Sequence, residues 1–243
     1  MPALRHLLFA VIALSFEAGA ATAGEFAEFR PIGFSQDGKV FAFEEFGIQD
    51  GSGFAFANRF FIDTTDDSFL PSSTVRIVIK DDPGSIGDAR ARAAAQSATL
   101  EARYRFADTP GTFAAFNPLS NLDGAAHLLR YTAFSMVPQP FAPYAVTLQE
   151  KPLPPSALCE AFSDRSVGFR LELAEINGEP ASLVLHDDKS VPQSRGCPTG
   201  YRIGGALTHL ADGVSTHVVL VLVRSLGFEG ENGRWIAVTR RLE

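Results

Sequence analysis

The residues of this sequence that could do chemistry are mainly carboxylates on or beside predicted strands. Glu44 lies in the middle of the predicted strand 39–46 (KVFAFEEF). It shares a strand face with Val40 and Phe46, because side chains alternate along a strand. A buried carboxylate must be paired, hydrogen-bonded or neutralised. Glu44 is therefore either a catalytic acid or one half of a structural ion pair. We favour the ion pair, because Arg59 lies on the predicted partner strand.

A hydrolase that uses scattered carboxylates leaves no local motif in its sequence. Glu44, Asp37 and Asp63 are the candidate catalytic residues for a periplasmic hydrolase of this kind. The segment 213–217 (GVSTH) lacks the second Gly of a nucleophile elbow. The sequence also contains no zinc-protease, phosphate-loop or dinucleotide-binding motif. We therefore leave enzymatic activity open, favour a protein that is not an enzyme, and expect no cofactor.

A short acidic stretch follows a predicted strand, with carboxylates at Asp63, Asp66 and Asp67. Calcium takes six to eight oxygen ligands from flexible loops, which makes these three residues the candidate calcium ligands. The same composition is typical of a solvated turn, and on that interpretation we predict no metal site. The histidines beyond the N-terminal segment lie in different predicted elements at no ligand spacing: His127, His186, His209 and His217.

The chain has two cysteines, Cys159 and Cys197. In an oxidising compartment an even pair is most simply a disulfide, although two free buried thiols would also fit. The bond would close a loop of about 39 residues and stabilise the protein by about 4 kcal/mol if chain entropy alone counts. Both cysteines lie in loop-like segments, which reach the short Cα separation of a disulfide more easily than fixed strands do.

The N-terminal segment has the pattern of a secretory signal peptide. A basic start, Arg5-His6, precedes the apolar run 7–16 (LLFAVIALSF). The segment 21–23 (ATA) then offers a small-residue cleavage site. The apolar run is too short for a spanning helix, which needs about 20 apolar residues. We expect cleavage after Ala23 and a periplasmic or secreted protein, residues 24–243, with no membrane span.

The charge of the chain bears on its partners. The formal net charge is −7, and no run of basic residues occurs. Nucleic acids and anionic lipid surfaces attract basic proteins, so neither is an expected partner. A protein of the bacterial envelope is the candidate partner for an exported chain of this kind.

Strand patterns dominate the elements that must position these residues. The first half predicts strands at 39–46, 59–64 and 74–80, followed by one helix at 85–106. Ser85 and Asp88 form a capping-box pattern, and an Ala-rich stretch follows. The helix has no large apolar residue before Leu100, so we expect it to lie on the surface of a sheet.

The second half predicts further strands and two hairpins. A hairpin over 167–176 and 181–186 turns at Asn177-Gly178. A closing hairpin joins 216–224 (THVVLVLVR), the most apolar strand, to 234–242. The strand at 144–149 lies among prolines, which favours an edge position or an extended connector. We therefore predict one mainly β domain, residues 24–243, with about ten strands in layered antiparallel sheets and one helix.

Several segments resemble known proteins. A bacterial family of predicted secreted proteins with no assigned function is similar to this chain from about residue 30 to its end, through the segments 33–44, 47–53, 194–198, 227–230 and 234–239. The resemblance implies export and no particular activity. Residues 33–63 also distantly resemble a TolB-type propeller repeat, which implies an incomplete β-propeller as the alternative fold. The function expected is that of an exported binding or envelope-associated β domain, with the carboxylate hydrolase as the alternative.

Overall fold

The structure is a computed structural model that describes residues 24–80, 84–162 and 166–243. The predicted signal peptide, residues 1–23, lies outside the described residues. The described ranges contain thirteen strands in three antiparallel sheets, together with one α-helix and two short 3₁₀ helices. The predicted fold class, mainly β with layered antiparallel sheets and one helix, is confirmed. No helix within the described ranges is long and apolar enough to cross a membrane.

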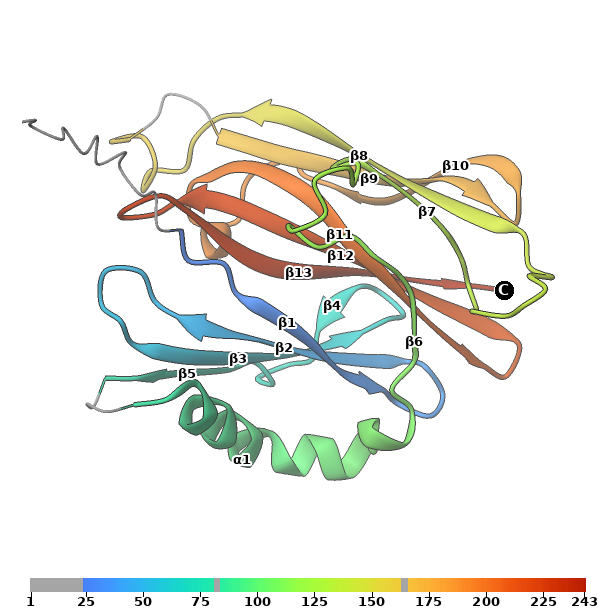
Figure 1. Cartoon of the computed structure of the whole chain (residues 1–243), viewed down its shortest axis with the longest axis horizontal. Helices are drawn as coiled ribbons and strands as arrows, with labels where there is room; N and C mark the ends of the chain where they lie inside the picture. Colours follow the sequence, from blue (N-terminus) through green and yellow to red (C-terminus); the bar gives the residue numbers. More distant parts are fainter. Residues whose placement is uncertain (1–23, 81–83, 163–165) are drawn as a thin grey trace, which may run out of the picture.

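The first sheet is built from the N-terminal strands. Its order is β1-β2-β3-β4, and β5 also pairs with β3. The helix α1 covers the outer face of this sheet (Figure 1). The bounds are β1 (Glu28–Phe34), β2 (Val40–Ile48), β3 (Ala55–Asp63), β4 (Ser68–Phe69), β5 (Val75–Ile79), α1 (Ile86–Tyr104) and the 3₁₀ helix η1 (Phe106–Asp108).

The other two sheets take the remaining strands. The middle sheet has the order β13-β12-β11-β6, and the third sheet has the order β10-β9-β8-β7. The bounds are β6 (Thr112–Phe116), β7 (Leu128–Thr132), β8 (Pro143–Leu153), β9 (Ser166–Ile176), β10 (Glu179–Asp187), the 3₁₀ helix η2 (Gln193–Arg195), β11 (Pro198–Ala211), β12 (Val214–Leu226) and β13 (Glu231–Leu242).

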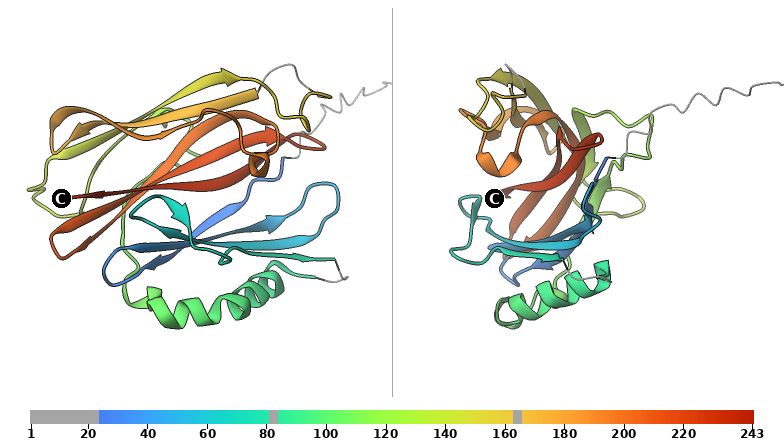
Figure 2. Two further views of the ribbon diagram at one scale, coloured as in Figure 1. Left: turned by 180° about the vertical axis from the view of Figure 1, so that it is seen from behind. Right: turned by 90° about the vertical axis from the view of Figure 1, so that its left-hand side faces the viewer.

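The sheets are stacked in layers. The middle sheet lies between the first sheet and the third, with α1 outside the first (Figures 1 and 2). One apolar core fills the space between the first and middle sheets, and a second fills the space between the middle and third sheets. The alternative of an incomplete β-propeller is not confirmed, because these sheets stack and do not radiate around an axis.

Strand β12 explains why the middle sheet is buried on both faces. Its side chains alternate between the two cores: Val218, Leu220 and Leu222 belong to one, and Val219, Val221 and Val223 belong to the other. An apolar run without polar alternation is what a strand between two packed layers requires. The predicted pairing of β12 with β13 is confirmed over the whole length of β13.

The helix α1 begins as the sequence predicts. The Ser85 side chain accepts a hydrogen bond from the Asp88 N–H, and the Asp88 carboxylate accepts one from the Ser85 N–H. The buried positions of the helix are the small residues Ala89, Ala93 and Ser97. Small side chains on this face let the helix lie close against β3 and β5.

The predicted disulfide between Cys159 and Cys197 is confirmed, with a Cα separation of 5.5 Å. The hairpin of β9 and β10 lies between the two cysteines and turns at Asn177-Gly178, both with positive φ as a type I′ turn needs. The prediction that the 144–149 strand is an edge strand or an extended connector is wrong. Strand β8 pairs with β9 on one side and β7 on the other, and its prolines, Pro143 and Pro152, lie at or near its ends.

Candidate functional site

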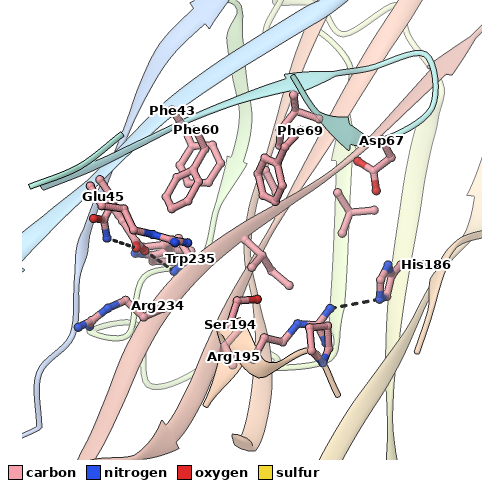
Figure 3. A pocket seen from close by; sticks show the side chains of 18 of the residues that line it. Phe43, Glu45, Phe60, Asp67, Phe69, His186, Ser194, Arg195, Arg234 and Trp235 are labelled. Atoms are coloured by element: carbon pink, nitrogen blue, oxygen red, sulfur yellow. Dashed lines mark hydrogen bonds between the residues drawn. The ribbon is translucent and has the colours of Figure 1, made fainter. Parts of the chain in front are cut away.

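A cavity of about 520 Å³ lies beside β13, the edge strand of the middle sheet. We call it the β13 cavity. The inner face of the first sheet forms one wall, and the segment after β10 that contains η2 closes the opposite side (Figure 3). The volume is in the range of small-molecule sites.

Cross-strand pairing sets the wall that the first sheet contributes. Glu45, Asn58 and Arg76 lie opposite one another on β2, β3 and β5, so their side chains form one polar row. Two residues away on the same face, Phe43 and Phe60 stack with ring centroids 4.9 Å apart. Phe69 from β4 and Trp235 from β13 extend this aromatic surface. The cavity therefore combines an aromatic wall with a polar row.

Glu45 is the most deeply buried polar group of the cavity, with 3% of its surface exposed. Its carboxylate accepts hydrogen bonds from the Trp235 N–H at 2.8 Å and the Asn58 amide at 2.9 Å. Burial raises the pKa of Glu45 above its usual range, although these two hydrogen bonds act in the opposite direction. Glu45 thus ties the first sheet to the edge of the middle sheet.

Asp67 and His186 lie at the other end of the cavity (Figure 3). The Asp67 carboxylate accepts from the Thr239 N–H at 2.7 Å and from its hydroxyl at 2.8 Å. Burial raises the pKa of Asp67, against the effect of these hydrogen bonds. His186 and Arg195 both contact Asp188, at 2.8 Å and 2.6 Å. Burial would raise the pKa of Asp188, but these contacts lower it to about 2.

Three arginines line the cavity, and they differ in their partners. Arg195 is paired with Asp188, and Arg234 is paired with Glu25. Arg76 is exposed, and no carboxylate of the described residues lies within ion-pair distance of it. Its guanidinium lies 5.9 Å from the centre of the Phe60 ring. Of the three arginines that line the cavity, Arg76 is therefore the one available to pair with a ligand.

Comparison with known proteins places the chain in a family. Residues 42–241 match the family model described as "Predicted secreted protein (DUF2259)". The chain belongs to this family. The matched range includes every residue that lines the β13 cavity. It confirms the resemblance drawn from the sequence, and the family description agrees with the predicted secretion. No curated protein and no solved structure matches the chain significantly.

Glu44 lies on the opposite face of β2 from the cavity, under α1. Its two oxygens contact Arg59 at 3.3 Å and Arg90 at 3.0 Å, and 1% of its side chain is exposed. Arg59 also donates to the Ser97 hydroxyl at 3.0 Å and contacts Glu101. The predicted partner Arg59 is found, and the helix supplies Arg90 as a second partner that the sequence did not indicate. This arrangement is that of a structural ion-pair network.

The remaining predicted carboxylates do not meet in one site. Asp37 accepts from the Ser35 hydroxyl and the Lys39 N–H and so stabilises the turn before β2. Asp63 and Asp66 accept from the N–H groups of residues two positions later, as in solvated turns. Asp67 alone of the acidic stretch reaches the β13 cavity. In residues 24–80, 84–162 and 166–243, no group of three or more His, Cys, Asp or Glu is placed to hold a metal.

Glu45, Arg76 and Arg195 are site residues that were not predicted from the sequence. A signal for Glu45 was present: 39–46 is apolar on both strand faces, so two consecutive glutamates must both be buried. The cluster of His186, Asp188 and Arg195 left no periodic signal, because its members lie at a strand end, in a loop and in a short 3₁₀ helix.

His217 lies in the core between the middle and third sheets. Its Nδ1 is 2.9 Å from the Tyr131 hydroxyl and its Nε2 is 3.0 Å from the Ser215 hydroxyl. Burial lowers the pKa of His217 to about 4. Ser215 belongs to the segment that lacks a nucleophile elbow. The imidazole is thus neutral in the folded protein and hydrogen-bonded at both nitrogens.

Stability should therefore fall as the pH falls from about 6.5 to 4. The unfolded chain protonates His217 near pH 6.5 and the folded chain only near pH 4, so the unfolded state binds more protons in this window. This difference in proton binding lowers the free energy of unfolding by about 3 kcal/mol at pH 4 relative to neutral pH. We expect His217→Gln to flatten the dependence of unfolding free energy on pH between 4 and 6.5, measured by urea denaturation. An unchanged slope would show that other groups cause it.

Proposed function

We propose that this secreted protein binds a small organic anion with an apolar body in the β13 cavity. The observation that carries the proposal is an aromatic cavity of about 520 Å³ beside one guanidinium, Arg76, that lacks an ion-pair partner among the described residues. Binding sites are typically concave and mostly apolar, with a few polar groups that orient the ligand. Phe43, Phe60 and Phe69 would contact the apolar body, and Arg76 would pair with the anionic group.

The other charged groups of the cavity already make hydrogen bonds or ion pairs within the protein, which favours binding over catalysis. Glu45 and Asp67 accept hydrogen bonds from the backbone of β13. Arg195 and Arg234 are held by Asp188 and Glu25. Groups held in this way form a rigid frame around a ligand. The proposed role as a binding domain needs no metal or cofactor.

Ligand binding is expected to change the fluorescence of Trp235, which is the single tryptophan of the chain and lines the cavity. We expect Arg76→Gln to raise the Kd of an apolar carboxylate, from a panel of medium-chain fatty acids and aromatic acids, by about ten-fold or more, since hydrogen bonds to charged groups contribute about 1.5–3 kcal/mol. Fluorescence titration of the purified mature protein measures this.

Arg92→Gln is the matched control, because Arg92 is an exposed arginine on α1 that does not line the cavity. It should bind as the wild type does. Equal affinity of the Arg76 and Arg92 variants would show that Arg76 does not bind the ligand. If no acid changes the Trp235 fluorescence, the proposal is refuted. If the protein hydrolyses a bound ligand and Glu45→Gln abolishes this turnover, the proposed function would change from binding to hydrolysis.

A further inference from the structure

The edge of β13 that faces the cavity has backbone groups that the fold leaves without a neighbouring strand. Strand β13 pairs with β12 on one side only. Along an antiparallel strand, residues alternate in pointing their N–H and C=O groups toward one neighbour or the other. The Trp235 and Thr239 N–H groups donate to the Glu45 and Asp67 carboxylates, so both point away from β12.

Ala237 lies midway between these two residues, and the register of β13 with β12 has no irregularity. The Ala237 N–H and C=O must therefore point away from β12 as well. Ala237 is half-buried and lines the cavity. No hydrogen-bond partner for either group is found within the described ranges. One residue of the edge strand thus offers a donor and an acceptor to the inside of the cavity.

Gly233 and the N–H groups on both sides of Ala237 already have partners on this edge. Near its beginning, Gly233 exchanges hydrogen bonds with the backbone of Glu25 and Ala27. Glu45 and Asp67 then take the N–H groups on either side of Ala237. A long strand from another protein would have to displace both carboxylates, whereas a single extended residue opposite Ala237 would not. Exposed strand edges are commonly protected in such ways against pairing with other chains.

We propose that the ligand of the β13 cavity is a short peptide, with one of its residues hydrogen-bonded to both backbone groups of Ala237 and its C-terminal carboxylate paired with Arg76. This inference rests on the proposed function and narrows its organic anion to a peptide acid. Addition of an extended peptide to a sheet edge provides affinity through the main chain, and the walls beside it select the side chains. Here the aromatic wall selects apolar side chains.

The experiment compares peptide and non-peptide acids on the full mature protein by Trp235 fluorescence. The probes are N-acetylated tripeptides of Leu, Val and Phe with a free carboxylate, and alkyl carboxylates of equal length without amides. We expect the best tripeptide to bind at least ten-fold more tightly than any alkyl carboxylate. One amide N–H of the tripeptide donates to the Ala237 C=O in this proposal. Methylation of that nitrogen should abolish the ten-fold advantage, and methylation of the other amide nitrogens should not. Pentapeptides should bind within three-fold of the tripeptide.

On the protein, Ala237→Pro removes the N–H that points into the cavity and leaves the hydrogen bonds between β12 and β13 in place. It should lower tripeptide affinity at least ten-fold, whereas Ala237→Ser, which keeps the N–H, should not. If the proline variant fails to fold, the methylated peptides decide the question. Equal binding of peptides and alkyl carboxylates would overturn the peptide inference and leave the proposed function standing. Absence of binding by both classes would overturn both.

Discussion

Replacement of Arg59 by Met should lower the free energy of unfolding by about 3–5 kcal/mol, the range found when one partner of a buried ion pair is removed. The Glu44 side chain is 1% exposed and would keep only Arg90, whose own side chain is 28% exposed. Met keeps an apolar stem and makes no hydrogen bond, so the effect reports the ion pairs and the hydrogen bond that the Arg59 guanidinium makes. Urea denaturation monitored by circular dichroism measures it.

Two further variants isolate the ion pair as the cause. Arg30→Met is the matched control, because Arg30 is an exposed arginine on β1, opposite Glu44, with no ion pair among the described residues. It should change stability by at most about 0.5 kcal/mol. The double variant Glu44→Leu with Arg59→Met removes both charges and should recover a large part of the loss. If Arg59→Met lowers the free energy of unfolding as little as Arg30→Met does, the ion-pair network is contradicted.

Reduction of the Cys159–Cys197 disulfide should lower stability by up to about 4 kcal/mol, because the bond closes a loop of about 39 residues in the unfolded chain. Residual pairing of the β9–β10 hairpin in the unfolded chain would keep the two ends of this segment near each other, so this value is an upper limit. At this chain length, each kcal/mol moves the melting midpoint by roughly 2–4 °C. Calorimetry with and without a thiol reductant measures the shift.

The variant with both cysteines replaced by Ala serves as the control for the reductant. Its melting midpoint should not respond to reduction, whereas that of the wild type should fall by several degrees. Thiol titration under denaturing conditions without reductant should find no free thiol in the wild type. Two free thiols per chain, or equal midpoints in both conditions, would contradict the expectation.

The ion pair at Glu44 shows what could be predicted from the sequence. Alternation within 39–46 placed Glu44 on a buried face, and the neighbouring strand supplied Arg59. These are local and cross-strand relations, which periodicity reveals. Arg90 could not be assigned in this way, because its contact depends on how α1 lies on the first sheet, and amphipathic pattern alone does not determine that orientation.

The β13 cavity shows what could not be predicted. Glu45 meets Trp235, and Asp67 meets Thr239, across separations of 190 and 172 residues. No local pattern predicts which edge strand will lie beside which sheet. Asp67 was grouped with Asp63 and Asp66 because of its position in the chain, but its backbone has a φ of 59° and its side chain points toward β13.

Strand β6 was missed for a related reason. No element was predicted at residues 112–116, where Phe113 and Phe116 flank small residues. Strand β6 pairs with β11 alone, at the edge of the middle sheet, and is only partly buried. A short edge strand of this kind is determined by its partner more than by its own propensity.

The position of the middle sheet has a consequence for how the protein matures during export. Three of its four strands, β11 to β13, come last in the chain, yet they fill the space between the other two sheets. Until they emerge, the Phe-rich face of the first sheet and the Leu-rich face of the third have nothing to pack against. A chain delivered N-terminus first therefore exposes both apolar faces until its final segment arrives. Such exposure promotes aggregation, so the interval before the last three strands arrive is when the chain is most prone to it.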